Sequence, residues 1–329
     1  MKSKPYVVRN STEVRRRLEG KWIPPGHKLF VIDAKNLYPS LPLEALFLAV
    51  ALEIRIWYNT DYALAIFAIR LLHLVLYNQT VSFDGVVYLN IHGLATGIAA
   101  GVSLANIFLS GGDPAIASHP AADEYHRYID DSFLVSDDIT PVLAIMNSFH
   151  PDVIWEIQAT GEEVPFLDLL ISIGPDRRLS VDLYRKPQNR YMFVPASSCH
   201  PTHCLDGIAR SEATRIARLA HPRTRSKHLA FLEDRLVSRG FTRCRLRRIF
   251  RAVSGSRVSR PPHDDSRRFA FHIKHGSSVP AQGIRKVLQR HSVVLKRALH
   301  RQPRFVLARH LQPSIGLRRY RQNWPNRVG

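Results

Sequence analysis

Short apolar runs separated by polar turns fill the first 190 residues, and this pattern predicts a mixed α+β domain. Residues 29–33 form one such run and end at Asp33, as expected of a buried strand with a carboxylate at its tip. Residues 81–83 and 86–88 flank Asp84-Gly85, a sequence typical of a β-hairpin turn. Further strands are predicted at residues 125–129, 133–136, 153–157, 166–173 and 179–184.

Helices are predicted between these strands, at residues 43–57, 61–77 and 98–109 and again from Thr140. Asp61 stands where a capping side chain is expected. Residues 62–77 are the most apolar stretch, but they contain Arg70 and His73 and are shorter than the ~20 residues that cross a bilayer. We therefore expect a buried helix there and no membrane association.

From about residue 205 the pattern becomes helical and basic, with helices predicted at residues 205–219, 227–238 and 242–253. The periodicity weakens after Ser254. These changes divide the chain into a basic, loosely structured lead-in, an α+β domain, an all-α domain and a basic, partly disordered C-terminal region. Their predicted bounds are 1–28, 29–190, 191–254 and 255–329.

Charge is distributed unevenly along the chain, whose net charge is +20. Residues 1–32 carry a net +6, residues 33–172 a net −13, and residues 173–329 a net +27. Such a chain binds polyanions at its basic flanks, and its acidic middle concentrates carboxylates in one place. A globular domain with a basic tail is the simpler alternative. The 3 cysteines and the polar N-terminus exclude a disulfide scaffold and a signal peptide, so we expect an intracellular, nuclear protein.

The candidate chemistry lies in Asp33 and in the adjacent pair Asp130-Asp131. Taken alone, the pair is a solvated turn and Asp33 a turn or capping residue. The apolar residues on both sides of the pair weaken that alternative, because two buried acids are costly unless a cation neutralises them. If the two strands are neighbours, Asp33 and Asp130 converge. The result is an oxygen-rich site for Mg²⁺, and two such ions would suit phosphoryl transfer.

Three segments resemble the conserved motifs of reverse transcriptases, in the family's order. Residues 33–38, with Tyr38 five positions after Asp33, resemble motif A. Residues 93–97 and 103–108 resemble motif B, and Tyr128-Ile129-Asp130-Asp131 resembles motif C.

Residues 164–169, 183–187 and 198–201 further resemble the reverse transcriptases of Penelope-like retroelements. The resemblance covers roughly residues 5–220. It implies a right-hand polymerase palm, an antiparallel sheet with helices on one face, followed by an all-α basic thumb. The family carries its fingers before motif A, and only 32 residues precede Asp33 here, so the resemblance implies a chain with most of its fingers missing.

The resemblance also implies residue roles. Asp33, Asp130 and Asp131 would be catalytic. Asp33 and Asp130 would bind both Mg²⁺ ions, for which Mn²⁺ could substitute, and Asp131 would assist as a less direct ligand. The carbonyl of Ala34 would complete one metal shell, Tyr38 would select deoxynucleotides, and Gly97 would let the backbone approach the incoming nucleotide. A core tyrosine is the alternative for Tyr38. The residues expected to contact primer and template are Lys186, Arg210 and Arg215, and a solvated surface lysine is the alternative for Lys186.

The reaction implied is RNA-directed DNA synthesis, with an RNA template, a DNA primer and deoxynucleoside triphosphates as partners. Two alternatives to this polymerase activity stay open. In the first, the chain is an inactive retroelement remnant that only binds nucleic acid. In the second, it is a chromosomal DNA-binding protein that uses the helices of residues 225–253. The segment from Cys199 to Cys204 alternates Cys and His, but its spacing matches no standard zinc site, and a loop is the preferred interpretation.

Overall fold

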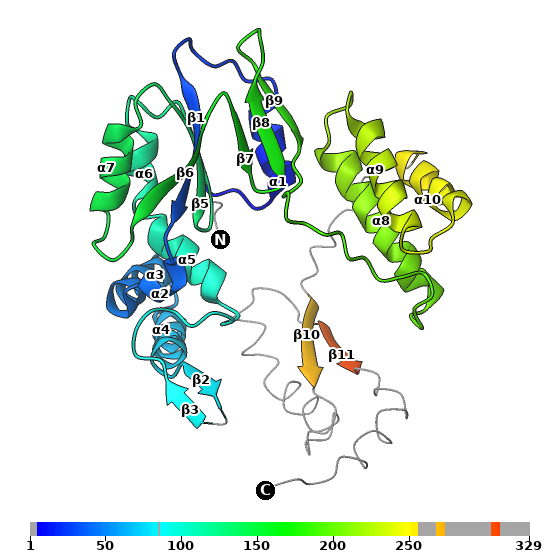
Figure 1. The fold of residues 1–329 in the computed structure, drawn as a ribbon. Helices are drawn as coiled ribbons and strands as arrows, with labels where there is room; N and C mark the ends of the chain where they lie inside the picture. The colour runs from blue at the N-terminus through cyan, green and yellow to red at the C-terminus, as the bar shows by residue number, and fades with distance from the viewer. Residues whose placement is uncertain (1–4, 85, 256–267, 274–303, 310–329) are drawn as a thin grey trace, which may run out of the picture. The chain divides into compact units, whose positions relative to one another are not determined.

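A computed structural model of the protein describes residues 5–84, 86–255, 268–273 and 304–309 (Figure 1). The chain divides into two units, Met1–Arg257 and Val258–Gly329. In the second unit, β10 (Arg268–Ile273) pairs with β11 (Arg304–Arg309) in parallel. The predicted partial disorder of residues 255–329 falls largely outside the described residues.

The first unit is built around a four-stranded sheet in the order β4-β5-β1-β6. Its antiparallel strands are β1 (Lys28–Ala34), β4 (Glu124–Tyr128), β5 (Asp131–Ser136) and β6 (Trp155–Gly161). In the central strand β1, Leu29 and Val31 face one hydrophobic cluster, whereas Phe30 and Ile32 face another. The apolar run predicted as a buried strand is therefore buried from both sides of the sheet.

Helices cover one face of this sheet. They are α2 (Leu37–Ser40), α3 (Leu43–Trp57), α4 (Tyr62–Tyr77), α5 (Gly101–Leu109), α6 (Asp113–Ala117) and α7 (Thr140–Ser148). The other face is covered by α1 (Ser11–Leu18) and by a second antiparallel sheet, as Figure 1 shows. The second sheet contains β7 (Glu163–Phe166), β8 (Leu169–Ile173) and β9 (Leu179–Leu183). The predicted α+β class with antiparallel sheets is confirmed.

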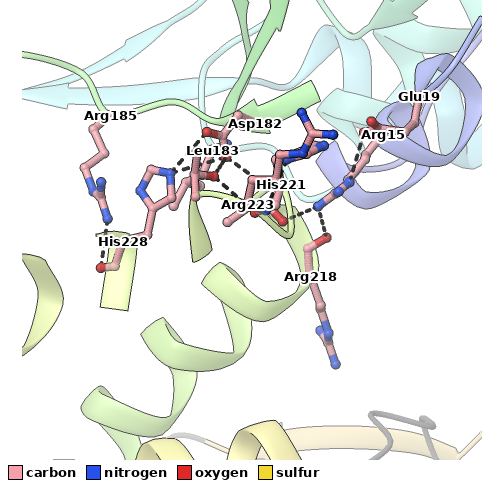
Figure 2. A network of polar contacts seen from close by, with 11 residues as sticks. Arg15, Glu19, Asp182, Leu183, Arg185, Arg218, His221, Arg223 and His228 are labelled. Carbon is pink, nitrogen blue, oxygen red and sulfur yellow. Dashed lines mark hydrogen bonds and ion pairs between the residues drawn. The ribbon is translucent and has the colours of Figure 1, made fainter. Parts of the chain in front are cut away.

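The all-α region consists of α8 (Thr202–Leu219), α9 (Arg225–Val237) and α10 (Arg243–Gly255). It attaches to the second sheet through Asp182 of β9, at the centre of the polar network in Figure 2. The Asp182 carboxylate accepts hydrogen bonds from the His221 backbone N–H at 2.8 Å and the Thr224 hydroxyl at 2.9 Å, and His228 lies 3.3 Å away. Burial acts to raise the pKa of Asp182, but these hydrogen bonds outweigh it and lower the pKa.

The lead-in predicted as loosely structured contains a packed helix. Asn10 caps α1 by accepting a hydrogen bond from the backbone N–H of Glu13 at 3.0 Å. Val14 and Leu18 are fully buried. Arg15 donates to the backbone carbonyls of Arg218 and Ala220, which ties α1 to the end of α8 (Figure 2).

The strand predicted over residues 166–173 is two strands. β7 ends at Phe166 and β8 begins at Leu169, and Leu167 between them has a positive φ of 56°. Asp168 is the one polar residue in this turn, because both flanking strands contribute to the same core, and a single polar residue is a weak turn signal.

Residues 62–77 form the expected helix, but the expectation that this helix is buried is wrong. Only Ala65, Leu72 and Leu76 of α4 are buried, because α4 packs along one side against α3. A broad apolar surface remains exposed on α3, on α4 and on the hairpin of β2 (Thr80–Phe83) and β3 (Val86–Leu89), and its largest members include Leu48, Leu52, Tyr62, Phe67, Phe83 and Val87. No helix among the described residues has both the length and the apolar character to cross a membrane.

We expect Asp182→Ala to lower the free energy of unfolding by about 2 kcal/mol at pH 7, because several donors on the α8–α9 connection lose their acceptor. Urea denaturation followed by circular dichroism measures the change. The pKa of Asp182 is lowered from 3.8, so its contribution is complete above that pH and disappears as the pH falls further. The exposed Asp137→Ala is the control, and equal stability of the two variants would contradict this interpretation.

Candidate active site

Strand pairing brings the predicted carboxylates to one end of the main sheet. In the antiparallel pairing of β1 with β5, Asp33 lies directly opposite Asp131. The backbone N–H of Ala34 donates to the carbonyl of Asp130 at 3.1 Å, so the tip of β1 also contacts the β4–β5 turn. Residues about one hundred positions apart in sequence are thus adjacent in space, as the strand-neighbour hypothesis requires.

The electrostatics of this cluster are those of acids held close together. Burial, followed by the charges of Asp130 and Asp33, raises the pKa of Asp131 to about 6, and Lys186 opposes the shift. Burial and Asp130 also raise the pKa of Asp33, against hydrogen bonds with Gln158 and Asp131. The Asp33–Asp131 hydrogen bond opposes ionisation of Asp131 and favours that of Asp33, as expected when a protonated Asp131 donates to Asp33.

A cation would relieve this repulsion. Among the described residues, however, no three or more histidine, cysteine, aspartate or glutamate side chains form a group that could hold a metal ion. The direct side-chain partners are Asp33 and Asp131, and Asp130 acts on both through its charge. Mg²⁺ is usually bound by one or two carboxylates, with waters and substrate phosphates completing its shell. The donor chemistry of the pair fits such an ion, although a closed three-carboxylate set is not formed.

The loop that resembles motif B packs against Tyr38. The backbone N–H of Leu94 donates to the Tyr38 carbonyl at 2.8 Å, and Gly93, at φ +69°, approaches Pro39 so closely that a Cβ would lie 2.3 Å from its carbonyl oxygen. Gly97 is exposed at φ +102°, a conformation that strains any residue with a side chain. Burial and then Asp130 raise the pKa of Tyr38, so its hydroxyl lies near the carboxylates.

A cavity of about 360 Å³ is lined by residues of the β7–β8 turn, of the segment after β9 and of α8. Lys186 lines this cavity and is close enough to Asp131 to lower its pKa. Arg215 lines it too, and donates to Asp168 at 2.6 Å, whose other oxygen accepts from the Ser11 hydroxyl at 3.1 Å. Two of the three residues predicted to contact primer and template therefore share one cavity, which Arg185 and Tyr184 also line.

The third of these residues, Arg210, is exposed on α8 and does not line the cavity. Several other arginines of the helical region pair with carboxylates. Arg245 donates to Asp206 at 2.6 Å, and both Arg243 and Arg247 pair with Glu233. These three arginines hold the helices together rather than standing free for a ligand.

Cys199 and Cys204 are exposed, and His200 lies 2.6 Å from the Ser198 hydroxyl. As stated above for the described residues, these side chains do not form a metal-holding group. Thr202 to Cys204 already belong to the first turn of α8.

The residues that sequence analysis missed lie behind the acidic turn. Arg127 is fully buried and hydrogen-bonded to Asp113 of α6, and one of its nitrogens donates to the carbonyl of Ile129. The available signal was a basic residue inside a predicted strand, in a segment with only 4 basic side chains between residues 33 and 172.

Comparison with known proteins gives two kinds of similarity. A family model described as an animal helix-turn-helix domain matches residues 192–251, which contain α8, α9 and most of α10. No curated protein matches this chain.

The structure of telomerase from Candida albicans, in complex with a fragment of telomeric RNA, aligns at a TM-score of 0.52 with 11% identity, covering 77% of this chain and 49% of that chain. Apo telomerase from Candida tropicalis aligns at a TM-score of 0.42 with 11% identity, covering 90% and 55%. The chain thus spans about half the length of these structures. The first alignment shows that the fold is similar to that of a telomerase, and is thus polymerase-like.

We expect the carboxyl carbon of Asp131 to titrate near pH 6 in ¹³C NMR spectra of the metal-free protein. Asp130→Asn removes a like charge and should lower this pKa. Because the pKa of Asp131 is raised from 3.8, stability is complete at low pH and falls as the pH rises through 6. The loss should be about 1 kcal/mol, since the carboxyl is partly exposed and screened. A wild-type midpoint near 4 would contradict the described cluster.

Proposed function

We propose that this chain is the RNA-directed DNA polymerase domain of a retroelement, of the Penelope-like reverse transcriptase type. The observation that carries the proposal is the pairing of Asp33 with Asp131 on neighbouring strands, with Asp130 in the turn between β4 and β5. The similarity of the fold to a telomerase is consistent with it. In this proposal residues 29–190 are the palm and residues 191–254 the thumb.

The proposed reaction joins a primer 3′-hydroxyl to the α-phosphate of a deoxynucleoside triphosphate and releases pyrophosphate. Asp33 and Asp131, assisted by Asp130, would hold Mg²⁺ or Mn²⁺. The ion, when bound, supplies charge neutralisation to the reacting phosphates. The chain's own contribution is mainly positioning, since phosphoryl transfer needs little covalent chemistry from the protein.

The nucleotide would lie between the tip of β1 and the motif B loop. Ala34 directly follows Asp33 and would turn its carbonyl to the metal shell. Tyr38 packs beside the loop that ends at Gly97, and its ring is within 3.4 Å of the Cβ position of Gly101. A tyrosine held in this way would contact the sugar and exclude a 2′-hydroxyl, the group that distinguishes RNA from DNA precursors.

Primer and template would extend from the carboxylates along the second sheet towards α8. Lys186, which lies close enough to Asp131 to lower its pKa, shares a cavity with Arg215, and Arg210 is another exposed cation of α8. Cationic side chains at these points would contact phosphates without reading sequence. The Candida albicans telomerase is described in complex with RNA, and that supports an RNA template here.

A second candidate, DNA binding without catalysis, is favoured by the helix-turn-helix match over residues 192–251. The pairing of Arg245 with Asp206 and of Arg247 with Glu233 weakens it, because these two arginines of α10 are engaged inside the helical region. A protein that only binds nucleic acid has no use for the cluster of acids at Asp33 and Asp131, because these carboxylates repel phosphates.

Primer extension on an RNA template tests the proposal. With Mg²⁺ and deoxynucleoside triphosphates we expect extension by the wild type and a loss of at least about 10³-fold in Asp130→Asn, because the acidic site is disrupted. Duplex binding, measured by fluorescence anisotropy, should stay within about threefold in the same variant. Tight binding with no extension by the wild type would contradict the polymerase and favour the second candidate.

Replacement of Tyr38 tests its proposed contact with the sugar. Tyr38→Ala should raise incorporation of ribonucleotides relative to deoxynucleotides by about 10²-fold, since the ring no longer excludes the 2′-hydroxyl. Tyr38→Phe keeps the ring and should retain the selectivity of the wild type. Single-nucleotide kcat/KM values give the ratio, and unchanged selectivity in Tyr38→Ala would make Tyr38 a packing residue.

A further inference from the structure

The most deeply buried charge of the first unit lies directly behind the acidic turn. The side chain of Arg127 is 0% exposed and that of its partner Asp113 is 3% exposed. The guanidinium donates two parallel hydrogen bonds of 2.8 Å to the carboxylate, from Nε to Oδ1 and from Nη2 to Oδ2. Tyr125 adds a third bond to Asp113 at 2.9 Å. This is the bidentate geometry that fixes orientation as well as charge.

The other nitrogen of Arg127 reaches the turn itself. Nη1 donates to the backbone carbonyl of Ile129 at 3.0 Å and to the side-chain oxygen of Asn106 at 2.9 Å. Nη2 also contacts the hydroxyl of Ser110 at 3.3 Å. One guanidinium therefore joins α5, which follows the motif B loop, to the residue immediately before Asp130.

Ile129 needs such support, because its φ is +58°. A β-branched residue rarely adopts this left-handed conformation, which persists only when its surroundings hold it. The conformation turns the chain so that Asp130 and Asp131 follow at the tip of the β4–β5 hairpin.

We propose that Arg127 and Asp113 are positioning residues for the acidic turn, which they hold against α5 and α6 so that its carboxylates stay in register with Asp33. The inference rests on the proposed function only for its effect on catalysis. Arg127 contacts neither substrate nor reacting atoms. It acts through the Ile129 carbonyl, and Asp113 acts by fixing the guanidinium.

A purely structural role makes a different prediction. When both members of a buried ion pair are replaced by apolar residues, the stability of the protein is often unchanged or improved. When only one member is removed, the other charge stays buried without a partner. The double variant Arg127→Met/Asp113→Leu should therefore fold with a urea midpoint near that of the wild type, yet lack the donor to Ile129. If the pair only supports folding, this variant behaves as the wild type in every other respect.

The deciding measurement is amide hydrogen exchange at residues 129–131, followed by NMR in protein without metal or substrate. We expect exchange at least about tenfold faster in the double variant. The control is Arg17→Met/Glu13→Leu, which removes another ion pair, of 2.6 Å, in α1, and should leave this exchange unchanged. Unchanged exchange in a folded Arg127→Met/Asp113→Leu variant would overturn the inference, whether or not the wild type extends primers.

Catalysis provides the second readout. Where the wild type extends primers, we expect the double variant to lose at least about tenfold in kcat with a much smaller change in the KM for nucleotide, because misplaced carboxylates affect reaction more than binding. If that variant does not fold, Arg127→Lys is used in its place. This variant keeps a cation beside Asp113 but lacks the second nitrogen that donates to Ile129, and it should show the same faster exchange. Wild-type exchange and kcat in Arg127→Lys would then refute the positioning role.

Discussion

The candidate site depends on the antiparallel pairing of β1 with β5, which sets Asp33 opposite Asp131. The two acids cannot separate without breaking the ladder of a strand that is buried from both faces. Burial and then the charges of Asp130 and Asp33 raise the pKa of Asp131, and Lys186 offsets only part of this effect. The fold therefore holds a concentration of negative charge that a divalent cation would stabilise, and the proposed chemistry follows from this constraint.

The surrounding architecture holds this charge in place from several directions. The helices on one face of the sheet include α5 and α6, which Arg127 connects to the acidic turn. The cavity with Lys186 and Arg215 is lined by the β7–β8 turn, the segment after β9 and α8. Asp182 fixes the α8–α9 connection to the second sheet. The sheets and the helical region are thus parts of one framework.

Much of the fold could be predicted from local sequence, because its signals are local. The apolar run that ends at Asp33 is a strand, Asp61 caps α4, and β2 and β3 on either side of Asp84-Gly85 pair as a hairpin. The adjacency of Asp33 to the Asp130-Asp131 turn was also foreseen, through the order of motifs and the condition that two strands be neighbours.

The predictions that were wrong, and the features that were missed, concern parts of the fold that depend on tertiary contacts. The lead-in around Val14 is ordered by packing on β9 and α8, which lie far away in sequence. The exposed side of α4 and the turn at Leu167 depend on which surfaces are packed against other elements. Local periodicity does not contain that information. The pairing of Arg245 with Asp206, 39 residues earlier, likewise joins two helices and has no local signal.

The most direct test of the central claim is a crystal structure with Mn²⁺, a primer–template duplex and a nucleotide, read by anomalous scattering at the manganese edge. The claim predicts an anomalous peak between the carboxylates of Asp33 and Asp131, beside the β4–β5 turn. A structure with bound duplex and nucleotide in which manganese lies elsewhere, or in which the two carboxylates are apart, would contradict it.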